Sequence, residues 1–327
     1  MKPEEKCLRI GAIVVLFAVF LRFAGSGFAR DMTALFENPT ISSVLLYAGT
    51  GRVYCAPSAD VPIPEKPQET VPDSTEQPVQ PLFSPEDATL VSVRNYPGYE
   101  IDIPAMLEQP LDWNLTQTEP TVLVFHSHTS ESYENTEGYD ASDPYRTRDE
   151  NYNMISIGRY LTQCLQERGI GVIHDTTVHD YPSYNNAYSL SRETVKQYLE
   201  AYPSIRLVLD IHRDAYEDAN GKQASDTVTV NGQESARLMI VAGTDAGGYT
   251  HTAWRDNLSL AVKLHTVLQK KYPGLCRDLT MRSYYFNQDL SAGALLVEVG
   301  TAGDTRQEAL YAAELLADGI AQLSSGV

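Results

Sequence analysis

The feature that most limits the fold is a pattern that occurs three times: a short apolar run followed directly by His, Glu or Asp. The three copies are VLVFHSHTSESY at 122–133, LVLDIHRDA at 207–215 and LLVEVGTAGD at 295–304. Each apolar run has the length and composition of one buried strand in a parallel sheet. Because reactive groups collect at the carboxyl ends of such strands, the polar residues of all three copies are predicted to meet at one edge of a sheet.

Beyond these motifs, the chain from residue 87 onward alternates between strand and helix patterns. The predicted strands cover 121–125, 170–174, 206–211, 238–242 and 295–299, and the predicted helices cover 151–168, 190–202, 254–272 and 305–323. Such alternation predicts an α/β fold with a central, mostly parallel sheet and helices on both faces. Apolar residues make up 43% of the chain, enough for one sizeable core, so residues 87–327 are predicted to form one domain.

The first 86 residues have a different character. Ile10–Leu21 is uncharged and strongly apolar and has basic residues on both sides, so we expect residues 1–30 to hold a cytoplasmic tip and a transmembrane anchor. A cleaved signal peptide is the alternative, because a small-x-small pattern ends at Ala29. Either segment would place the rest of the chain outside the cytoplasm. Residues 31–86 are predicted to be a juxtamembrane stretch and a disordered linker rich in Pro and Glu.

Charge, cysteine content and missing motifs exclude several classes of protein. Lys and Arg number 25 against 43 Asp and Glu, and this net charge of −18 argues against nucleic acid as a partner. The four cysteines are far apart and form no C-x-x-C pair, which argues against a cysteine-ligated zinc site or a redox pair. The sequence also lacks a G-x-S-x-G elbow, a phosphate-binding loop and H-E-x-x-H.

The histidines of the first two motifs point to a metal site. A catalytic zinc usually has three protein ligands and an open position for water, and His128 and His212 supply two of them. The third ligand is predicted to be Glu131 or Glu150. Glu131 follows His128 at H-x-x-E spacing, and Glu150 opens the predicted helix 151–168, where acidic residues are also common because they suit the helix dipole. The residues alone leave both candidates open.

Glu298 is a carboxylate inside an otherwise apolar strand. Burial of a carboxylate without a partner is costly, so its presence there needs a reason. The functional interpretation is a catalytic acid or base that activates a zinc-bound water, with its pKa raised by its surroundings. The structural alternative is a salt bridge, for which Arg282 is a candidate partner.

Three more residues are predicted to lie around the substrate. Asp210 shares a strand face with His212 and could hold its imidazole as a partner behind the metal. Arg213 is predicted to contact a substrate carboxylate. His126 is predicted to lie just behind the metal ligands.

Four strings together resemble one known family. FHSHTSESY, VHDYPSYNNAY, LVLDIHRDA and FNQDLSAGALLVEVGT are similar to the stage II sporulation protein P family, which are peptidoglycan hydrolases of endospore-forming bacteria. The resemblance covers about residues 121–323 and extends to the layout of membrane segment and spacer. More distantly, the domain resembles the zinc N-acetylmuramoyl-L-alanine amidases.

The resemblance implies a cofactor and residue roles. It implies Zn²⁺ on His128 and His212, with Glu298 as the catalytic glutamate. Glu150 matches the amidase carboxylate ligand by spacing, whereas Glu131 belongs to the T-S-E-S-Y string typical of the sporulation family, so Glu131 is narrowly favoured. The string 179–184, which is also typical of the family, is expected to line the cleft.

The resemblance also implies a reaction, partners and a location. The reaction is hydrolysis of the amide between N-acetylmuramic acid and L-alanine, and cleavage of peptide cross-links is a second activity associated with the family. The partners are peptidoglycan and the engulfment proteins of the septal membrane, including a lytic transglycosylase. The location is the cell membrane, in a single pass, with residues 87–327 on the extracytoplasmic side as the catalytic domain. The alternatives are a zinc carboxypeptidase-like metallopeptidase, supported by H-x-x-E, and a non-catalytic scaffold that binds the cell wall.

Overall fold

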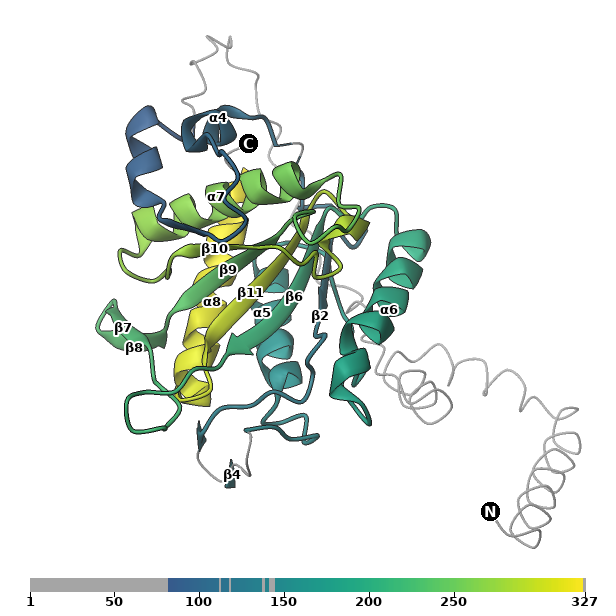
Figure 1. The fold of residues 1–327 in the computed structure, drawn as a ribbon, viewed down its shortest axis with the longest axis vertical. Coiled ribbons are helices and arrows are strands. Elements are labelled where there is room, and N and C mark those ends of the chain that lie inside the picture. The colour runs from purple at the N-terminus through teal and green to yellow at the C-terminus, as the bar shows by residue number, and fades with distance from the viewer. Residues whose placement is uncertain (1–81, 112, 118, 137–138, 141–144, 326–327) are drawn as a thin grey trace, which may run out of the picture. The chain divides into compact units, whose positions relative to one another are not determined.

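A seven-stranded sheet with the order β1-β10-β9-β11-β6-β2-β5 forms the centre of the fold (Figure 1). The computed structural model describes residues 82–327 except 112, 118, 137–138, 141–144 and 326–327. The strands of the sheet are β1 (Val93–Asn95), β2 (Val122–Phe125), β5 (Val172–His174), β6 (Leu207–Asp214), β9 (Leu238–Gly243), β10 (Leu279–Arg282) and β11 (Ala294–Thr301). Neighbouring strands are parallel, with the exception of the antiparallel pair β9 and β11. The predicted α/β fold with a mostly parallel sheet is therefore confirmed.

The remaining elements surround this sheet. The helices are α4 (Ile103–Glu108), α5 (Met154–Glu167), α6 (Ala187–Ala201), α7 (Trp254–Lys271) and α8 (Arg306–Ser325). Short 3-10 turns occur at η1 (Pro85–Leu90), η2 (Tyr184–Asn186) and η3 (Gln288–Leu290), and two small hairpins pair β3 (Asn135–Thr136) with β4 (Tyr139–Asp140) and β7 (Thr227–Val230) with β8 (Gln233–Ala236). All of the residues described belong to the compact unit Pro78–Val327.

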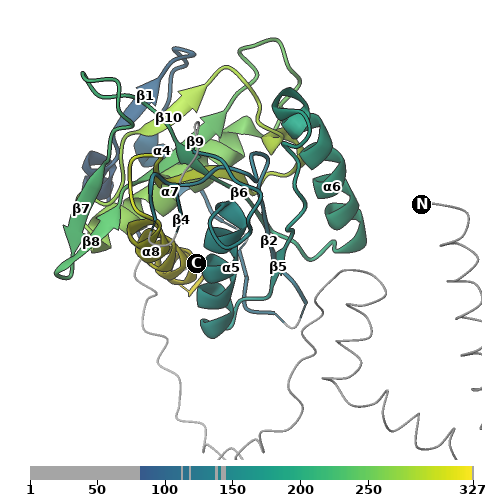
Figure 2. The same cartoon turned by 90° about the horizontal axis from the view of Figure 1, so that it is seen from below.

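The two faces of the sheet are covered unequally. On one face, the apolar sides of α5, α7 and α8 pack against alternate strand residues such as Leu209 and Val297 to form the main core. On the other face, α6 covers only the part around β2, where Val195 packs with Leu123 and Phe125. Figure 2 shows α5 and α6 on opposite sides of β2. On that second face, residues of β9 and β11 border a cavity instead of helix α6.

Some element boundaries differ from the predictions in ways that affect the site. Strand β6 continues to Asp214, three residues beyond its predicted end, so His212 lies within the strand. Helix α5 begins only at Met154, because Asn153 caps it by accepting a hydrogen bond from the Ile155 amide. Glu150 is therefore outside the helix that was expected to aim it. The edge strand β1, its neighbour β10, helix α4 and the hairpin β7–β8 were not predicted.

The predicted anchor and nearly all of the predicted linker fall on residues 1–81, which lie outside the described residues. None of the helices that the structure describes is both long and apolar enough to cross a membrane. The domain boundary near residue 87 stays a prediction.

Candidate metal centre and cleft

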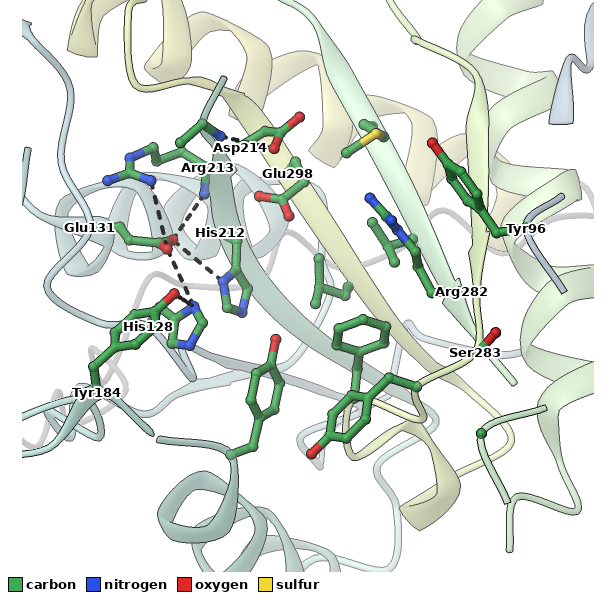
Figure 3. Close-up of a pocket in the computed structure, with 18 of the residues that line it drawn as sticks. Tyr96, His128, Glu131, Tyr184, His212, Arg213, Asp214, Arg282, Ser283 and Glu298 are labelled. Carbon is green, nitrogen blue, oxygen red and sulfur yellow. Dashed lines mark hydrogen bonds and ion pairs between the residues drawn. The ribbon is translucent and has the colours of Figure 1, made fainter. Parts of the chain in front are cut away.

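Three of the predicted metal ligands converge at the end of β2 and on β6. His128, Glu131 and His212 each place one ligand atom within 4.8 Å of the others. Glu131 lies between the two imidazoles, with Oε1 3.3 Å from His128 Nδ1 and Oε2 3.4 Å from His212 Nδ1 (Figure 3). Two imidazoles and a carboxylate are a donor set that zinc uses in hydrolytic enzymes. The residues present therefore fit a divalent cation.

Local backbone structure explains why these side chains meet. The chain turns directly after β2, and the Glu131 amide donates to the His128 carbonyl at 3.2 Å, which sets the two side chains of H-x-x-E next to each other. His212 comes from β6, which pairs with β2 in parallel. The site thus combines one turn and one neighbouring strand.

Asp210 orients the His212 ring. Its Oδ1 lies 2.8 Å from His212 Nε2, which leaves Nδ1 facing Glu131. Asp210 also accepts hydrogen bonds from the amide and the hydroxyl of Ser127, at 2.8 and 2.7 Å. Burial alone would raise the pKa of Asp210, but His212 and Ser127 outweigh it and hold the pKa below its usual range. An ionised carboxylate behind a metal-binding imidazole is the arrangement that fixes its tautomer.

Arg213 lies beside Glu131 rather than in open cleft space. Its side chain is buried, Nε donates to the Ser132 carbonyl and Nη2 donates to the Tyr145 carbonyl, both at 2.9 Å. Burial opposes ionisation of Glu131, but Arg213 and the two imidazoles hold the pKa of Glu131 well below its usual range. The geometry therefore favours a role for Arg213 in keeping Glu131 charged over the predicted contact with a substrate carboxylate.

Glu298 lies beside His212 on the floor of the cleft. The two residues are register partners on the adjacent parallel strands β11 and β6, so their side chains share one face. Burial, with further contributions from Glu131 and Asp214, raises the pKa of Glu298 to about 8 despite the opposing effect of His212. Its Oε2 has no hydrogen-bond partner in the described chain, and no ion pair with Arg282 occurs there. A half-buried carboxyl group whose pKa is raised toward neutral pH is suited to acid–base chemistry.

Two predicted residues are not brought into this cluster. Glu150 is 54% exposed and lies 3.4 Å from the Arg159 guanidinium. His126 is fully buried on the opposite face of the sheet, where Nδ1 bonds to the Ile211 carbonyl at 2.8 Å and Nε2 lies 2.9 Å from His174 Nε2. The strand alternation explains this position, because Phe125 already faces the α6 side.

An aromatic cleft extends from the ligand cluster across the sheet. It has a volume of about 750 Å³, and Met239, Val241 and Leu296 line it together with the proposed ligands. Six aromatic residues from segments far apart in sequence also line it: Tyr96, Tyr184, Tyr188, Tyr249, Tyr284 and Phe286. At the far end, the Arg282 guanidinium stacks over the Tyr96 ring at 4.6 Å.

Of these aromatic residues, only Tyr184 belongs to the string 179–184 that was expected to line the cleft. Its ring stacks on His128 at 4.2 Å. Sequence reasoning missed the others, although the run SYYF at 283–286, directly after β10, was a usable signal.

The family model described as stage II sporulation protein P matches residues 55–321. Stage II sporulation protein P of Bacillus subtilis (strain 168) is 28% identical over 214 residues, which are 62% of this chain and 51% of that protein. The chain thus spans about half the length of this curated relative.

Solved structures show a weaker likeness. An N-acetylmuramoyl-L-alanine amidase of Nostoc punctiforme has a TM-score of 0.37 and 14% identity, over 61% of this chain and 94% of that one. An N-acetylmuramoyl-L-alanine amidase of Clostridium difficile 630 has a TM-score of 0.36 and 16% identity, over 63% and 95%. Similarity at this level does not define an activity.

Proposed function

Since the chain belongs to the stage II sporulation protein P family, we propose that it is a zinc-dependent peptidoglycan hydrolase that acts during spore engulfment. The proposed bond is the amide between N-acetylmuramic acid and L-alanine. The observation that carries this proposal is the convergence of His128, Glu131 and His212 beside Glu298 in an open cleft. A metal-ligand set next to a proton carrier is the minimum that metal-assisted amide hydrolysis requires.

In this proposal, His128, Glu131 and His212 hold the zinc ion. When bound, Zn²⁺ supplies Lewis acidity toward the scissile carbonyl and lowers the pKa of water. Asp210 keeps the Nδ1 side of His212 turned toward Glu131. Arg213 favours the ionised form of Glu131.

Glu298 is the proposed proton carrier. It takes a proton from the attacking water and delivers it to the nitrogen of the leaving amine. Its half-buried position on β11, beside His212, supports this role because the carboxyl group has a raised pKa and changes its protonation state near neutral pH.

Location and partners follow from the family and are also proposals. The catalytic domain, proposed as residues 87–327, would act outside the cytoplasm at the septal membrane, held by an anchor in residues 1–30. Peptidoglycan would be its substrate. Other engulfment proteins, including a lytic transglycosylase, would act beside it.

One digestion experiment tests the hydrolase. The full chain in mild detergent is incubated with purified peptidoglycan, with zinc and with a chelator, and the products are identified by mass spectrometry. Free stem peptides that begin at L-alanine are expected, and they should disappear with the chelator and return with zinc. Glu298→Gln should lower the rate by about 10²- to 10⁴-fold. Glu150→Gln is the matched control, because this exposed glutamate lies outside the ligand cluster.

The same digest separates the alternatives. The adjacency of His128 and Glu131 at H-x-x-E spacing also suits a metallopeptidase, which would release a single terminal residue or cleave cross-links instead. A folded, zinc-loaded chain that yields no products, even from peptidoglycan already processed by a transglycosylase, would contradict the hydrolase proposal and favour a wall-binding scaffold.

A further inference from the structure

We infer that the Tyr188 hydroxyl donates a hydrogen bond to the carbonyl oxygen of the scissile amide as that oxygen gains negative charge. This would make Tyr188 a catalytic residue in addition to Glu298. The inference rests on the proposed hydrolase function. It also assigns a role to the last of the three tyrosines in the string 178–188, which has no part in the roles proposed above.

The Tyr188 ring lies against both proposed histidine ligands. It is nearly parallel to the His212 imidazole, with an interplanar angle of 12° and ring centroids 6.4 Å apart. It meets the His128 ring at 72°, with centroids 5.2 Å apart. On its other side it contacts Tyr284 and Phe286 across the cleft, at 5.7 and 5.8 Å. The phenol therefore stands between the proposed metal position and the aromatic wall.

The hydroxyl of Tyr188 makes no hydrogen bond with the residues that the structure describes. The hydroxyls of neighbouring tyrosines do: Tyr133 donates to the Val299 carbonyl at 2.7 Å, and the Tyr184 oxygen lies 3.2 Å from His128 Nδ1. For Tyr188, no hydrogen bond of the hydroxyl occurs within the described chain, although the residue lines the cleft. A phenol is protonated at neutral pH, so this group is a hydrogen-bond donor without an acceptor.

A buried network fixes the backbone of Tyr188 relative to the ligands. The Asn287 side-chain amide donates to the Tyr188 carbonyl at 2.8 Å and to the Ser191 hydroxyl at 3.1 Å. Ser191 bonds to the Ser127 hydroxyl at 2.8 Å, and Ser127 donates to Asp210, the partner of His212. The first turn of α6 is thus tied to the residue that orients a proposed ligand. Donors held in place before the reaction are those that stabilise a developing charge most effectively.

The proposed hydrolysis includes a step at which such a donor can act. When water attacks the amide carbon, a carbon–oxygen bond forms and the electrons of the carbonyl double bond move to its oxygen. A neutral phenol stabilises this charge through a hydrogen bond and keeps its own proton. When the carbon–nitrogen bond breaks, the electrons return to the carbonyl, and the nitrogen leaves with the proton that Glu298 carried.

The first test compares Tyr188→Phe with the wild type on a soluble muramoyl peptide, using the full chain loaded with zinc. The substitution removes the hydroxyl and keeps the ring that packs against His212. We expect kcat to fall by about 10²- to 10³-fold, the effect of removing one oxyanion donor, while KM and zinc content change little. Tyr198→Phe is the matched control: it lies on the same helix, outside the cleft, and should retain wild-type kcat.

A second measurement does not depend on turnover. Inorganic phosphate, a tetrahedral oxyanion, is titrated calorimetrically into the zinc-loaded wild type and Tyr188→Phe. An affinity at least about tenfold lower in the variant is expected from the loss of one hydrogen bond to a charged group. If the wild type hydrolyses nothing and the phosphate difference persists, the hydrolase proposal fails and the oxyanion-binding role of Tyr188 stands. The inference is overturned if Tyr188→Phe keeps both kcat and phosphate affinity within about threefold, or if it loses zinc, since the hydroxyl would then support the metal site.

Discussion

Replacing Glu131 and Glu150 separately with Gln distinguishes the two carboxylates that the sequence offered as metal ligands. Both substitutions preserve side-chain shape and remove one negative charge. Glu131 is 4% exposed and lies 3.3 and 3.4 Å from two imidazole nitrogens, whereas the Glu150 side chain is 54% exposed and faces Arg159. We therefore expect a large loss of zinc affinity for Glu131→Gln and a change of less than about twofold for Glu150→Gln, because exposed ion pairs contribute little.

The size of the loss follows from the position of Glu131. Removing a residue behind a metal ligand costs about 10- to 100-fold in affinity, and Glu131 contacts the metal position itself. The loss should therefore exceed about 100-fold, which corresponds to about 2.8 kcal/mol. Part of it comes from Arg213, whose buried guanidinium would keep its charge without a carboxylate 3.7 Å away.

A competition titration measures the effect. The full chain is titrated with zinc in the presence of a chromophoric chelator, and thermal unfolding of each metal-free variant checks that the fold is retained. Equal zinc affinities for the two variants would refute this assignment. A larger loss in Glu150→Gln would show instead that the chain before α5 moves to supply the ligand.

Four further predictions concern the surroundings of the site. Asp210→Asn should weaken zinc binding by about 10- to 100-fold in the same titration, because the His212 ring loses its orienting carboxylate; unchanged affinity would contradict that role. Gly158→Ala should lower the free energy of unfolding by about 1–3 kcal/mol in urea, because the added Cβ would lie 2.5 Å from Nε2 of both His126 and His174. A net gain in stability would show that these rings can move apart. Burial lowers the pKa of His174 well below its usual range, so the unfolded chain binds more protons than the folded chain at acidic pH. The contribution of His174 to the free energy of unfolding should be fully present above about pH 6.5 and should fall by up to about 1.4 kcal/mol per pH unit below it. His174→Gln should reduce this slope, and an identical slope would exclude His174 as its source. Burial raises the pKa of the Cys276 thiol to about 12, so a thiol-reactive reagent should modify Cys276 only after unfolding, as mapped by mass spectrometry. Rapid labelling of Cys276 in the native chain would contradict its buried position.

Much of the candidate site was accessible from sequence because it depends on strand periodicity. Asp210 and His212 alternate along one strand, and Glu298 occupies the same face of a neighbouring strand. The sequence pattern alone therefore predicts that Asp210, His212 and Glu298 lie on one face of the sheet, without knowledge of the full strand order. The proximity of Glu131 to His128 depends only on a turn of four residues.

Features set by long-range pairing could not be read in this way. The position of Glu150 depends on where α5 begins, and this was decided by the cap at Asn153, two residues after the predicted start of the helix. The antiparallel pairing of β9 with β11, which leaves part of the sheet face open to the cleft, has no local sequence signature.

The position of Glu298 and His212 within the sheet has a consequence for the dynamics of the site. Strands β11 and β6 are interior strands of the seven-stranded sheet, hydrogen-bonded on both sides, and backbone of this kind exchanges its amide hydrogens only when large parts of a domain open. His128 and Glu131 belong instead to a turn, whose local opening costs far less. Half of the candidate centre is therefore fixed by the most protected backbone of the domain, and half can relax independently. Loss of a bound ion should loosen the turn at 126–131 and leave the proton carrier in place, so that the chain can release and regain metal without dismantling its reaction surface.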